Sequence, residues 1–329
     1  MSRPPPPVNP EDRFRLALED LLARIGDADS TLTLSVSSDR AGAGGDGAPD
    51  DLLLRTFGGF QVLEPVGRGG MGVVYKAVQL DPGRPVALKV LAPRLRADPA
   101  ARARFRHEVR VAARLHHTHL VPVFAAAQGA DGPDAYAMPF IRGLSLAAVV
   151  RGLRGGFPEA PPHPGFVRVA ALYRTDPRAY AREVVGWVRQ AAEALDAAHR
   201  AGVVHRDVKP GNLLLEFTPA GRPHVWVHDF GLACQEGEED GWASAGGFGT
   251  RGYASPEMTA GDPAHRHPRT DIYALGVTLY ELLMLRRPRP EELTGARAGG
   301  VPRELIRVVK AAMTGGYATA CELATDRDR

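Results

Sequence analysis

The glycine-rich segment between two β-forming runs is the feature that most restricts the fold of this chain. Residues 60–78, FQVLEPVGRGGMGVVYKAV, have the pattern of a strand, a glycine turn and a second strand. A dinucleotide-binding fold would place a helix directly after the glycines, but residues 73–75 are β-formers. The segment therefore predicts either an ordinary hairpin or a flap whose backbone N–H groups approach phosphate oxygens.

The residues that follow predict a small, mostly antiparallel sheet with one helix packed on it, and then a helical region. PVALKVL (85–91) reads as a third strand, ARARFRHEVRVAARL (101–115) as a helix, and 120–127 and 135–141 as short apolar segments. Residues 270–283 predict an almost wholly apolar helix through a core. Another buried helical stripe recurs at spacings of four and three and comprises Val184, Val188, Ala191, Leu195 and Ala198.

Residues 1–59 are expected to be an N-terminal extension ahead of this domain. One amphipathic helix is predicted within residues 14–25, and AGAGGDGAPDD (41–51) has the composition of a linker. The segment is interpreted as a flexible leader or as a docking helix. The opening MSRPPPPVNPEDR contains no apolar run of the kind that signal peptides have.

Composition excludes several classes of protein. With 44% hydrophobic and 24% charged residues the chain is globular, and its arginines are scattered among acids rather than gathered in the basic stripe that nucleic-acid binding needs. Ile272 to Leu285, the longest apolar stretch, is too short to span a bilayer. Cys234 and Cys321 form no disulfide framework or metal spacing, which favours a reducing cytoplasm.

A rare lysine marks the segment HRDVKPGN (205–212). Lys209 is one of only four lysines among 41 basic residues. A compact ammonium fits a tighter space beside an anion than a planar guanidinium does, so this choice indicates a phosphate held close.

Six motifs occur in a fixed order along residues 60–290. They are GRGGMGVVY, VALK ending at Lys89, a helical Glu108, HRDVKPGN, DFG at 229–231 and ASPE at 254–257. This order is similar to that of the eukaryotic-like serine/threonine protein kinases found in bacteria. The resemblance implies an α+β, two-lobed kinase domain over 60–329. Its small antiparallel-sheet lobe would cover about 60–138, and its larger, mostly helical lobe about 142–329, shortened at its end.

The resemblance also implies ATP and Mg²⁺ as cofactors and serine or threonine hydroxyls of proteins as acceptors. Lys89 would hold the α and β phosphates and Glu108 would orient it, while Asn212 and Asp229 would bind Mg²⁺. The residues expected around the nucleotide are Val66, Gly67, Gly69, Gly70, Gly72, Val74, Ala87, Lys89, Met138, Pro139, Ile141 and Leu214. Pro139 in the hinge keeps the carbonyl that the base needs.

In the catalytic loop, the resemblance makes Asp207 the group that orients or accepts the proton of the attacking hydroxyl. Lys209 would balance charge at the γ phosphate, and Lys209 with Thr250 resembles the serine/threonine class rather than tyrosine kinases. The arginine directly before Asp207, Arg206, is similar to that of kinases in which a phosphate pairs with this arginine and orders the activation loop. Ser244 is the only residue with a hydroxyl group in residues 234–249. Three alternatives stay open: Ser244 is phosphorylated, the acidic residues of 236–240 partly substitute for a phosphate, or these acids are only a solvated run of charges.

Some segments depart from the family pattern. The region after Leu285 is short and lacks the arginine that pairs with Glu257, and an unpaired buried carboxylate there would cost about 3–5 kcal/mol. Ala112 is smaller than the leucine common at its position, and Leu153 to Tyr180 is read as a surface insertion.

Histidines and tryptophans are interpreted structurally. The histidines at 116, 117 and 119 and those at 265 and 267 lack matching ligands at fixed spacing, which disfavours a zinc site. The tryptophans at 187, 226 and 242 are expected to be packing residues.

Three functions remain open from the residues. The first is an active serine/threonine protein kinase that also phosphorylates itself. The second is a nucleotide-binding scaffold without catalysis, suggested by the shortened end. The third is a small-molecule phosphotransferase, which Lys209, Thr250 and ASPE disfavour. The oligomeric state is not predicted.

Overall fold

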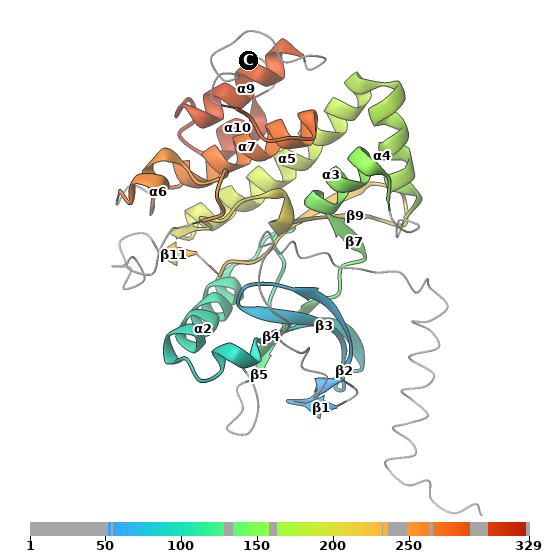
Figure 1. The fold of residues 1–329 in the computed structure, drawn as a ribbon, viewed down its shortest axis with the longest axis vertical. Coiled ribbons are helices and arrows are strands. Elements are labelled where there is room, and N and C mark those ends of the chain that lie inside the picture. Colours follow the sequence, from blue (N-terminus) through green and yellow to red (C-terminus); the bar gives the residue numbers. More distant parts are fainter. Residues whose placement is uncertain are drawn as a thin grey trace, which may run out of the picture.

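The computed structural model describes residues 52–53, 55–127, 134–157, 163–231, 233–235, 249–262, 266–289 and 302–326. Within these ranges the chain forms a sheet-based small lobe and a helical large lobe, which are the blue-to-teal and the green-to-red parts of Figure 1. This α+β, two-lobed arrangement is the predicted one. The helix expected at 14–25, the linker at 41–51, Trp242, Ser244 and His265 lie outside the described residues.

The small lobe is built on a six-stranded antiparallel sheet in the order β1-β2-β3-β4-β6-β5. The strands are β1 (Thr56–Phe57), β2 (Phe60–Arg68), β3 (Gly72–Gln79), β4 (Arg84–Leu91), β5 (Ala125–Ala127) and β6 (Ala135–Pro139). Alternating residues on one face, including Val62, Tyr75 and Leu88, are buried together in the core of this lobe. The glycines thus join two strands of one hairpin, as the sequence predicts.

Helix α2 (Pro99–Arg114) packs beside this sheet after a short 3₁₀ helix, η2 (Pro93–Leu95). The Asp98 side chain caps α2 by accepting a hydrogen bond from Ala100 N at 2.8 Å. On its inner face Phe105 is buried against Tyr136, with ring centroids 5.5 Å apart. Asp134, at the start of β6 and 3% exposed, forms ion pairs with Arg102 and Arg106 of α2.

Residues just before position 60 also belong to the packed part of the small lobe. Phe57 lies in β1, which pairs with β2, and Leu52 is buried in the same apolar cluster as Val62. The division of the chain at residue 60 stays a prediction, since the described residues on both sides of it share one core.

The large lobe is mostly helical. Its helices are α3 (Leu146–Gly155), α4 (Pro164–Thr175), α5 (Pro177–Arg200), α6 (Pro256–Ala260), α7 (Arg269–Met284), α9 (Arg303–Met313) and α10 (Ala320–Thr325). Its short strands are β7 (Gly143–Ser145), β8 (Val203–Val204), β9 (Leu213–Phe217), β10 (Pro223–Val227) and β11 (Cys234–Gln235), with a 3₁₀ helix, η3 (Pro210–Asn212). They form two small antiparallel sheets, β10-β9-β7 and β11-β8, between the helices and the small lobe.

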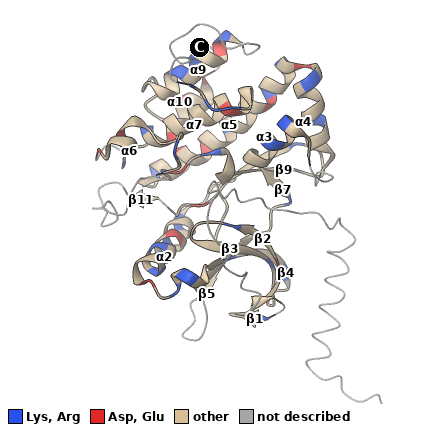
Figure 2. Ribbon diagram, in the orientation of Figure 1, with Lys and Arg blue, Asp and Glu red and all other residues tan. Residues whose placement is uncertain are grey.

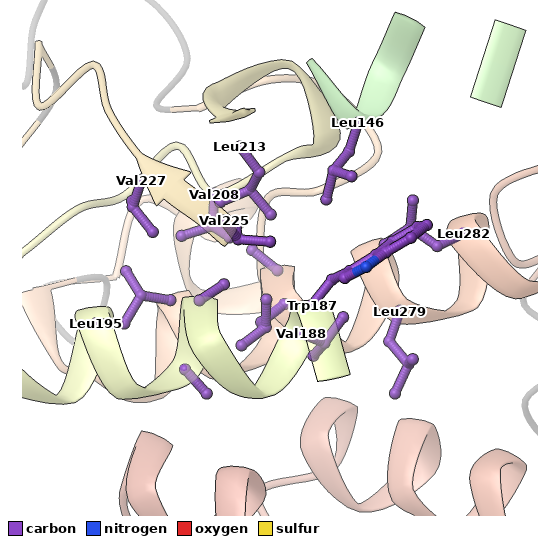
Figure 3. Close-up of a cluster of buried hydrophobic side chains, with 14 of the residues drawn as sticks. Leu146, Trp187, Val188, Leu195, Val208, Leu213, Val225, Val227, Leu279 and Leu282 are labelled. Atoms are coloured by element: carbon purple, nitrogen blue, oxygen red, sulfur yellow. The ribbon is translucent and has the colours of Figure 1, made fainter. Parts of the chain in front are cut away.

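The core of the large lobe lies where α5 and α7 meet the β9–β10 hairpin. Figure 3 shows Leu195 of α5 facing Val225 and Val227 of β10, while the Trp187 ring of α5 reaches toward Leu146 of α3 and Leu282 of α7. These residues are fully buried, and the five residues of the predicted α5 stripe are buried with them. The apolar sequence of α7 is explained by its position, because twelve of its residues are buried on all sides of the helix. Trp187 is a packing residue, as expected.

The segment Leu153 to Tyr180 is not a surface insertion, which corrects the sequence-based prediction. Most of it folds as α4 and the first turn of α5, and Phe166 and Val169 of α4 are fully buried in the main core. The Phe166 ring meets Phe217 of β9 edge to face, with centroids 4.9 Å apart. Pro164 and Gly165, which belong to this Pro- and Gly-rich composition, begin α4 itself.

The expectation that Glu257 is a buried, unpaired carboxylate that destabilises the fold is also wrong. Glu257 is exposed at the start of α6, so no buried carboxylate is left unpaired there. After α7 the described residues form α9 and α10 only, and α9 is the amphipathic helix that the sequence predicts. Among the described residues, no helix combines the length and the apolar character needed to cross a bilayer.

Candidate active site

A cavity of about 260 Å³ lies between the lobes and is lined by most of the residues that the sequence predicts. From the small lobe come Gly69, Gly70, Gly72, Val74, Ala87, Lys89, Met138 and Pro139, and from the large lobe Ile141, Asp207, Lys209, Asn212, Leu214 and Asp229. Gly67 and Val66 do not line this cavity. Val66 is nevertheless buried in the apolar cluster that holds Val74, Ala87 and Leu214, so it supports the wall from behind.

The glycine flap is shaped by close backbone contacts. Gly69 N donates to Gly72 O at 2.8 Å, which closes the tip of the β2–β3 hairpin. A Cβ at position 72 would lie 2.4 Å from Val90 O on the neighbouring strand, so only glycine fits there. Arg94 donates to Gly70 O at 2.7 Å and fixes the flap from the outside.

Lys89 lies at the junction of the two lobes. Its Nζ donates to Glu108 Oε1 at 2.6 Å and to Asp229 Oδ1 at 2.9 Å, so strand β4, helix α2 and the DFG segment meet at one ammonium. Tyr136 OH also donates to Glu108 Oε1, at 2.6 Å. A Cβ at Gly231 would lie 3.2 Å from Glu108 Oε2, which leaves little room for a side chain beside this cluster.

The charges of Lys89 and Asp229 support each other, whereas burial and the Asp229 carboxylate raise the pKa of Glu108. Burial alone would lower the pKa of Lys89, but the carboxylates of Asp229 and Glu108 raise it well above its usual value. Burial alone would raise the pKa of Asp229, yet the Lys89 ammonium holds it well below the usual range. Lys89 is therefore a cation and Asp229 an anion at neutral pH.

A second cluster surrounds the Asp207 carboxylate in the catalytic loop. Lys209 Nζ donates to Asp207 Oδ2 at 2.8 Å and to Thr250 Oγ1 at 2.6 Å. Thr250 Oγ1 in turn donates to Asp207 Oδ1 at 2.8 Å. Asn212 Nδ2 donates to the backbone oxygen of Asp207 at 2.8 Å and to Oδ2 at 3.1 Å. Both carboxylate oxygens are thus held in one orientation at the cavity.

The backbone of the catalytic loop is held from the core by Asp271 of α7. Its carboxylate is fully buried and accepts hydrogen bonds from His205 N and Arg206 N, each at 2.8 Å. His199 Nε2 lies 2.8 Å from the same group. Burial alone would raise the pKa of Asp271, but these hydrogen bonds, above all that of His199, lower it. Arg206 has a left-handed backbone with φ of 63° and is 6% exposed.

Asn212 and Asp229, the residues predicted to hold Mg²⁺, both line the cavity and have oxygen atoms suited to a hard cation, as does Asp207. In the described part of the chain, no three His, Cys, Asp or Glu side chains gather as a metal site. One carboxylate and one amide do not form a complete cage. They do suit Mg²⁺, which takes its remaining ligands from water and phosphates.

The sequence analysis did not predict five of the residues that line the cavity, which are Met71, Val121, Tyr136, His228 and Gly231. Strand alternation could have found Tyr136, which is two residues before Met138 and therefore on the same face of β6. His228 directly precedes Asp229. Burial lowers its pKa to about 4, with Lys89 and His205 adding to the effect and Asp229 opposing it.

Known proteins resemble this chain over most of its described length. The protein kinase domain family matches residues 60–311. Serine/threonine-protein kinase PknE of Mycobacterium tuberculosis is 37% identical over 238 residues, which cover 72% of this chain and 37% of that protein. Serine/threonine-protein kinase pkn3 of Myxococcus xanthus is 36% identical over 228 residues, 68% of this chain and 37% of that protein.

The fold has a matching solved structure as well. The crystal structure of the Mycobacterium tuberculosis PknI kinase domain superposes with a TM-score of 0.57 at 28% identity. That match covers 82% of this chain and 96% of the solved one. The chain spans about 37% of the length of the curated relatives named above.

Proposed function

The chain belongs to the protein kinase domain family, and on this premise we propose that it transfers the γ-phosphate of ATP to serine and threonine hydroxyls of proteins, itself included. The observation that carries the proposal is the orientation of Asp207. Its carboxylate is held by Lys209, Thr250 and Asn212 at the same cavity that contains the Lys89 ammonium. Phosphoryl transfer depends mainly on such positioning and charge.

The base of the nucleotide fits the apolar end of the cavity. Val74, Ala87 and Leu214 belong to one buried cluster there, which offers two faces for a planar ring. Pro139 contributes a carbonyl oxygen at the end of β6, where it pairs with Val86. Since a proline lacks only the N–H, this position can still accept a hydrogen bond from the base.

The phosphates fit the polar end. Lys89 supplies a positive charge that Glu108 keeps directed into the cavity, and Gly69, Gly70 and Gly72 let the flap backbone come close. Asp229 and Asn212 would hold Mg²⁺, which would supply further positive charge beside the phosphates. Asp229 is already ionised and available as an oxygen ligand.

The acceptor hydroxyl would lie at Asp207. Asp207 Oδ1 accepts hydrogen bonds from Thr250 N and Oγ1, and Oδ2 accepts from Lys209 and Asn212, so a substrate hydroxyl would donate to this carboxylate in place of one of these donors. Lys209 lies between this carboxylate and Thr250 and places an ammonium where negative charge moves during transfer. The protein therefore orients the nucleophile and stabilises the transferred group with different residues.

The test is incorporation of labelled γ-phosphate into the protein itself and into a generic protein substrate. Wild type should incorporate label, and the labelling rate of Asp207→Asn should be lower by at least about 100-fold, the usual scale of general-base catalysis. Asp98→Asn is the matched control, because asparagine caps α2 as well as aspartate does.

Two outcomes would favour the other candidate functions. If wild type binds Mg·ATP but labels nothing, the chain acts as a nucleotide-binding scaffold. If it labels sugars or antibiotics and no protein, it is a small-molecule phosphotransferase. The cytoplasmic location stays a prediction.

A further inference from the structure

A second hollow, of about 430 Å³, opens beside the catalytic loop on the large lobe. Four arginines line it: Arg151 and Arg154 of α3, and Arg286 and Arg287 directly after α7. Glu281 is the one carboxylate among its lining residues. Four guanidinium groups therefore face a single carboxylate, and the hollow carries a net positive charge.

The carboxylate is already engaged. Glu281 accepts a hydrogen bond from the Tyr253 hydroxyl, which belongs to the same hollow. The Arg287 guanidinium stacks over the Tyr253 ring at 5.7 Å and donates to Arg251 O at 2.8 Å. A Cβ at Gly252 would lie 2.3 Å from Arg287 Nη1, so a glycine is needed for this arginine to reach its place. One wall of the hollow is thus preorganised.

The opposite wall is a rigid helix face. The Ser145 side chain caps α3 by accepting from Ala148 N, and Leu146, Val149 and Val150 are buried beneath the helix. Arg151 and Arg154 are three residues apart, hence on the same side of the helix, and both are exposed. Figure 2 shows the blue colour of Lys and Arg residues on α3. In the described part of the chain neither guanidinium belongs to an ion pair.

Lys209 connects this hollow with the nucleotide cavity, because it lines both. Its Nζ contacts the Asp207 carboxylate at 2.8 Å. A polypeptide that presents a hydroxyl to Asp207 must therefore pass within a few residues of the four arginines.

We infer that the arginine-lined hollow binds anionic side chains of the protein substrate, carboxylate or phosphorylated, close to the acceptor residue. Guanidinium groups pair with carboxylates and phosphates through two parallel hydrogen bonds, and Arg is suited to both. The inference rests on the proposed kinase function and names its substrate class: proteins whose acceptor serine or threonine has acidic or phosphorylated neighbours.

The experiment uses the full chain and peptide sets with a single acceptor serine. At each of the five positions before and after the serine, the flanking residue is Glu, Gln or phosphoserine. Wild type should phosphorylate peptides with Glu at one or more of these positions with a higher kcat/KM than the Gln peptides. The phosphoserine set shows whether a phosphoryl group serves as well as a carboxylate.

The variant is Arg151→Gln/Arg154→Gln, and the matched control is Arg178→Gln/Arg182→Gln on the exposed face of α5. Both remove two positive charges. In the α3 variant the Glu-to-Gln ratio of kcat/KM should fall about fivefold, mainly through KM, as expected for two exposed ion pairs. The α5 control should keep the wild-type ratio.

The outcomes separate the inference from the function it depends on. If wild type labels neither itself nor any peptide, the kinase function fails and the inference falls with it. If wild type labels Glu and Gln peptides equally, the kinase function stands and the inference is wrong. An equal loss of the ratio in both double variants would also overturn it, because long-range charge alone would then explain the preference.

Discussion

Three side chains determine the geometry of Asp207, and one of them comes from a segment far away in the sequence. Lys209 and Asn212 belong to the same loop as Asp207, but Thr250 is 43 positions away. Thr250 is hydrogen-bonded to both Asp207 and Lys209. Its hydroxyl is therefore part of the site that receives the acceptor, although it does not line the nucleotide cavity.

Thr250→Ala should lower kcat about 10- to 100-fold with little effect on nucleotide binding. A hydrogen bond to a charged group contributes about 1.5–3 kcal/mol, which corresponds to that range of rates. Thr250→Ser, which keeps the hydroxyl, should restore most of the activity. Steady-state kinetics with a peptide substrate measures the effect, and an alanine variant with wild-type kcat would show that the hydroxyl is dispensable.

Because His228 is buried, the protein should lose free energy of unfolding in mild acid. The folded pKa of His228, about 4, lies below the ordinary value of 6.5, so between these pH values only the unfolded state takes up the proton. Stability from this group is present above pH 6.5 and falls as the pH decreases toward 4. Between pH 7 and 5 the free energy of unfolding should decrease by about 1–2 kcal/mol on this account.

Urea unfolding of wild type and His228→Gln at both pH values isolates the contribution. The variant should lose less free energy than wild type over the same interval. Identical losses would assign the pH dependence to other groups, of which His119 is one, since burial lowers its pKa as well.

At the scale of elements, the sequence predicted the helices and strands whose apolar residues alone show which side of the element is buried. Helices α2, α5 and α9 have a period of 3.6 residues, the β2–β3–β4 strands are β-forming runs separated by turns, and α7 is an almost wholly apolar run. α4 was missed because its amphipathic pattern is short and directly follows the Pro-rich sequence 158–164. Its burial depends on Phe217 in β9, a partner that local sequence cannot reveal.

Phe166→Ala should lower the free energy of unfolding by about 3–5 kcal/mol, the cost of removing a fully buried phenylalanine. The control is Val167→Ala on the next residue of α4, which is 56% exposed and should change stability by less than about 0.5 kcal/mol. Denaturant titration distinguishes the two. Equal small effects would mean that α4 lies on the surface after all.

At the scale of the whole molecule, the two lobes meet at the Lys89 cluster. Lys89 in β4 and Glu108 in α2 belong to the small lobe, and Asp229 follows β10 of the large lobe. The order of motifs predicted that these residues meet in one cleft. It could not predict the arginine-lined hollow, because α3 and the end of α7 are 132 positions apart between Arg154 and Arg286 and no motif joins them.

Nucleotide binding should therefore stabilise the whole domain, and Mg²⁺ should be required for the full effect. A non-hydrolysable ATP analogue with Mg²⁺ at 100 times its Kd should raise the free energy of unfolding by about 2.7 kcal/mol. In Asp229→Asn the increment due to Mg²⁺ should be largely lost. Thermal unfolding with and without Mg²⁺ measures this, and a wild-type increment that is the same without the metal would argue against the Asp229 and Asn212 site.

Asp271 has a consequence for how this protein loses activity when it is heated. Its buried carboxylate joins the backbone of the catalytic loop to α7, and α7 runs through the hydrophobic core. We therefore expect the loop to become disordered together with the core. A partly heated sample should be a mixture of fully competent and fully denatured molecules, so residual activity would count the surviving native molecules.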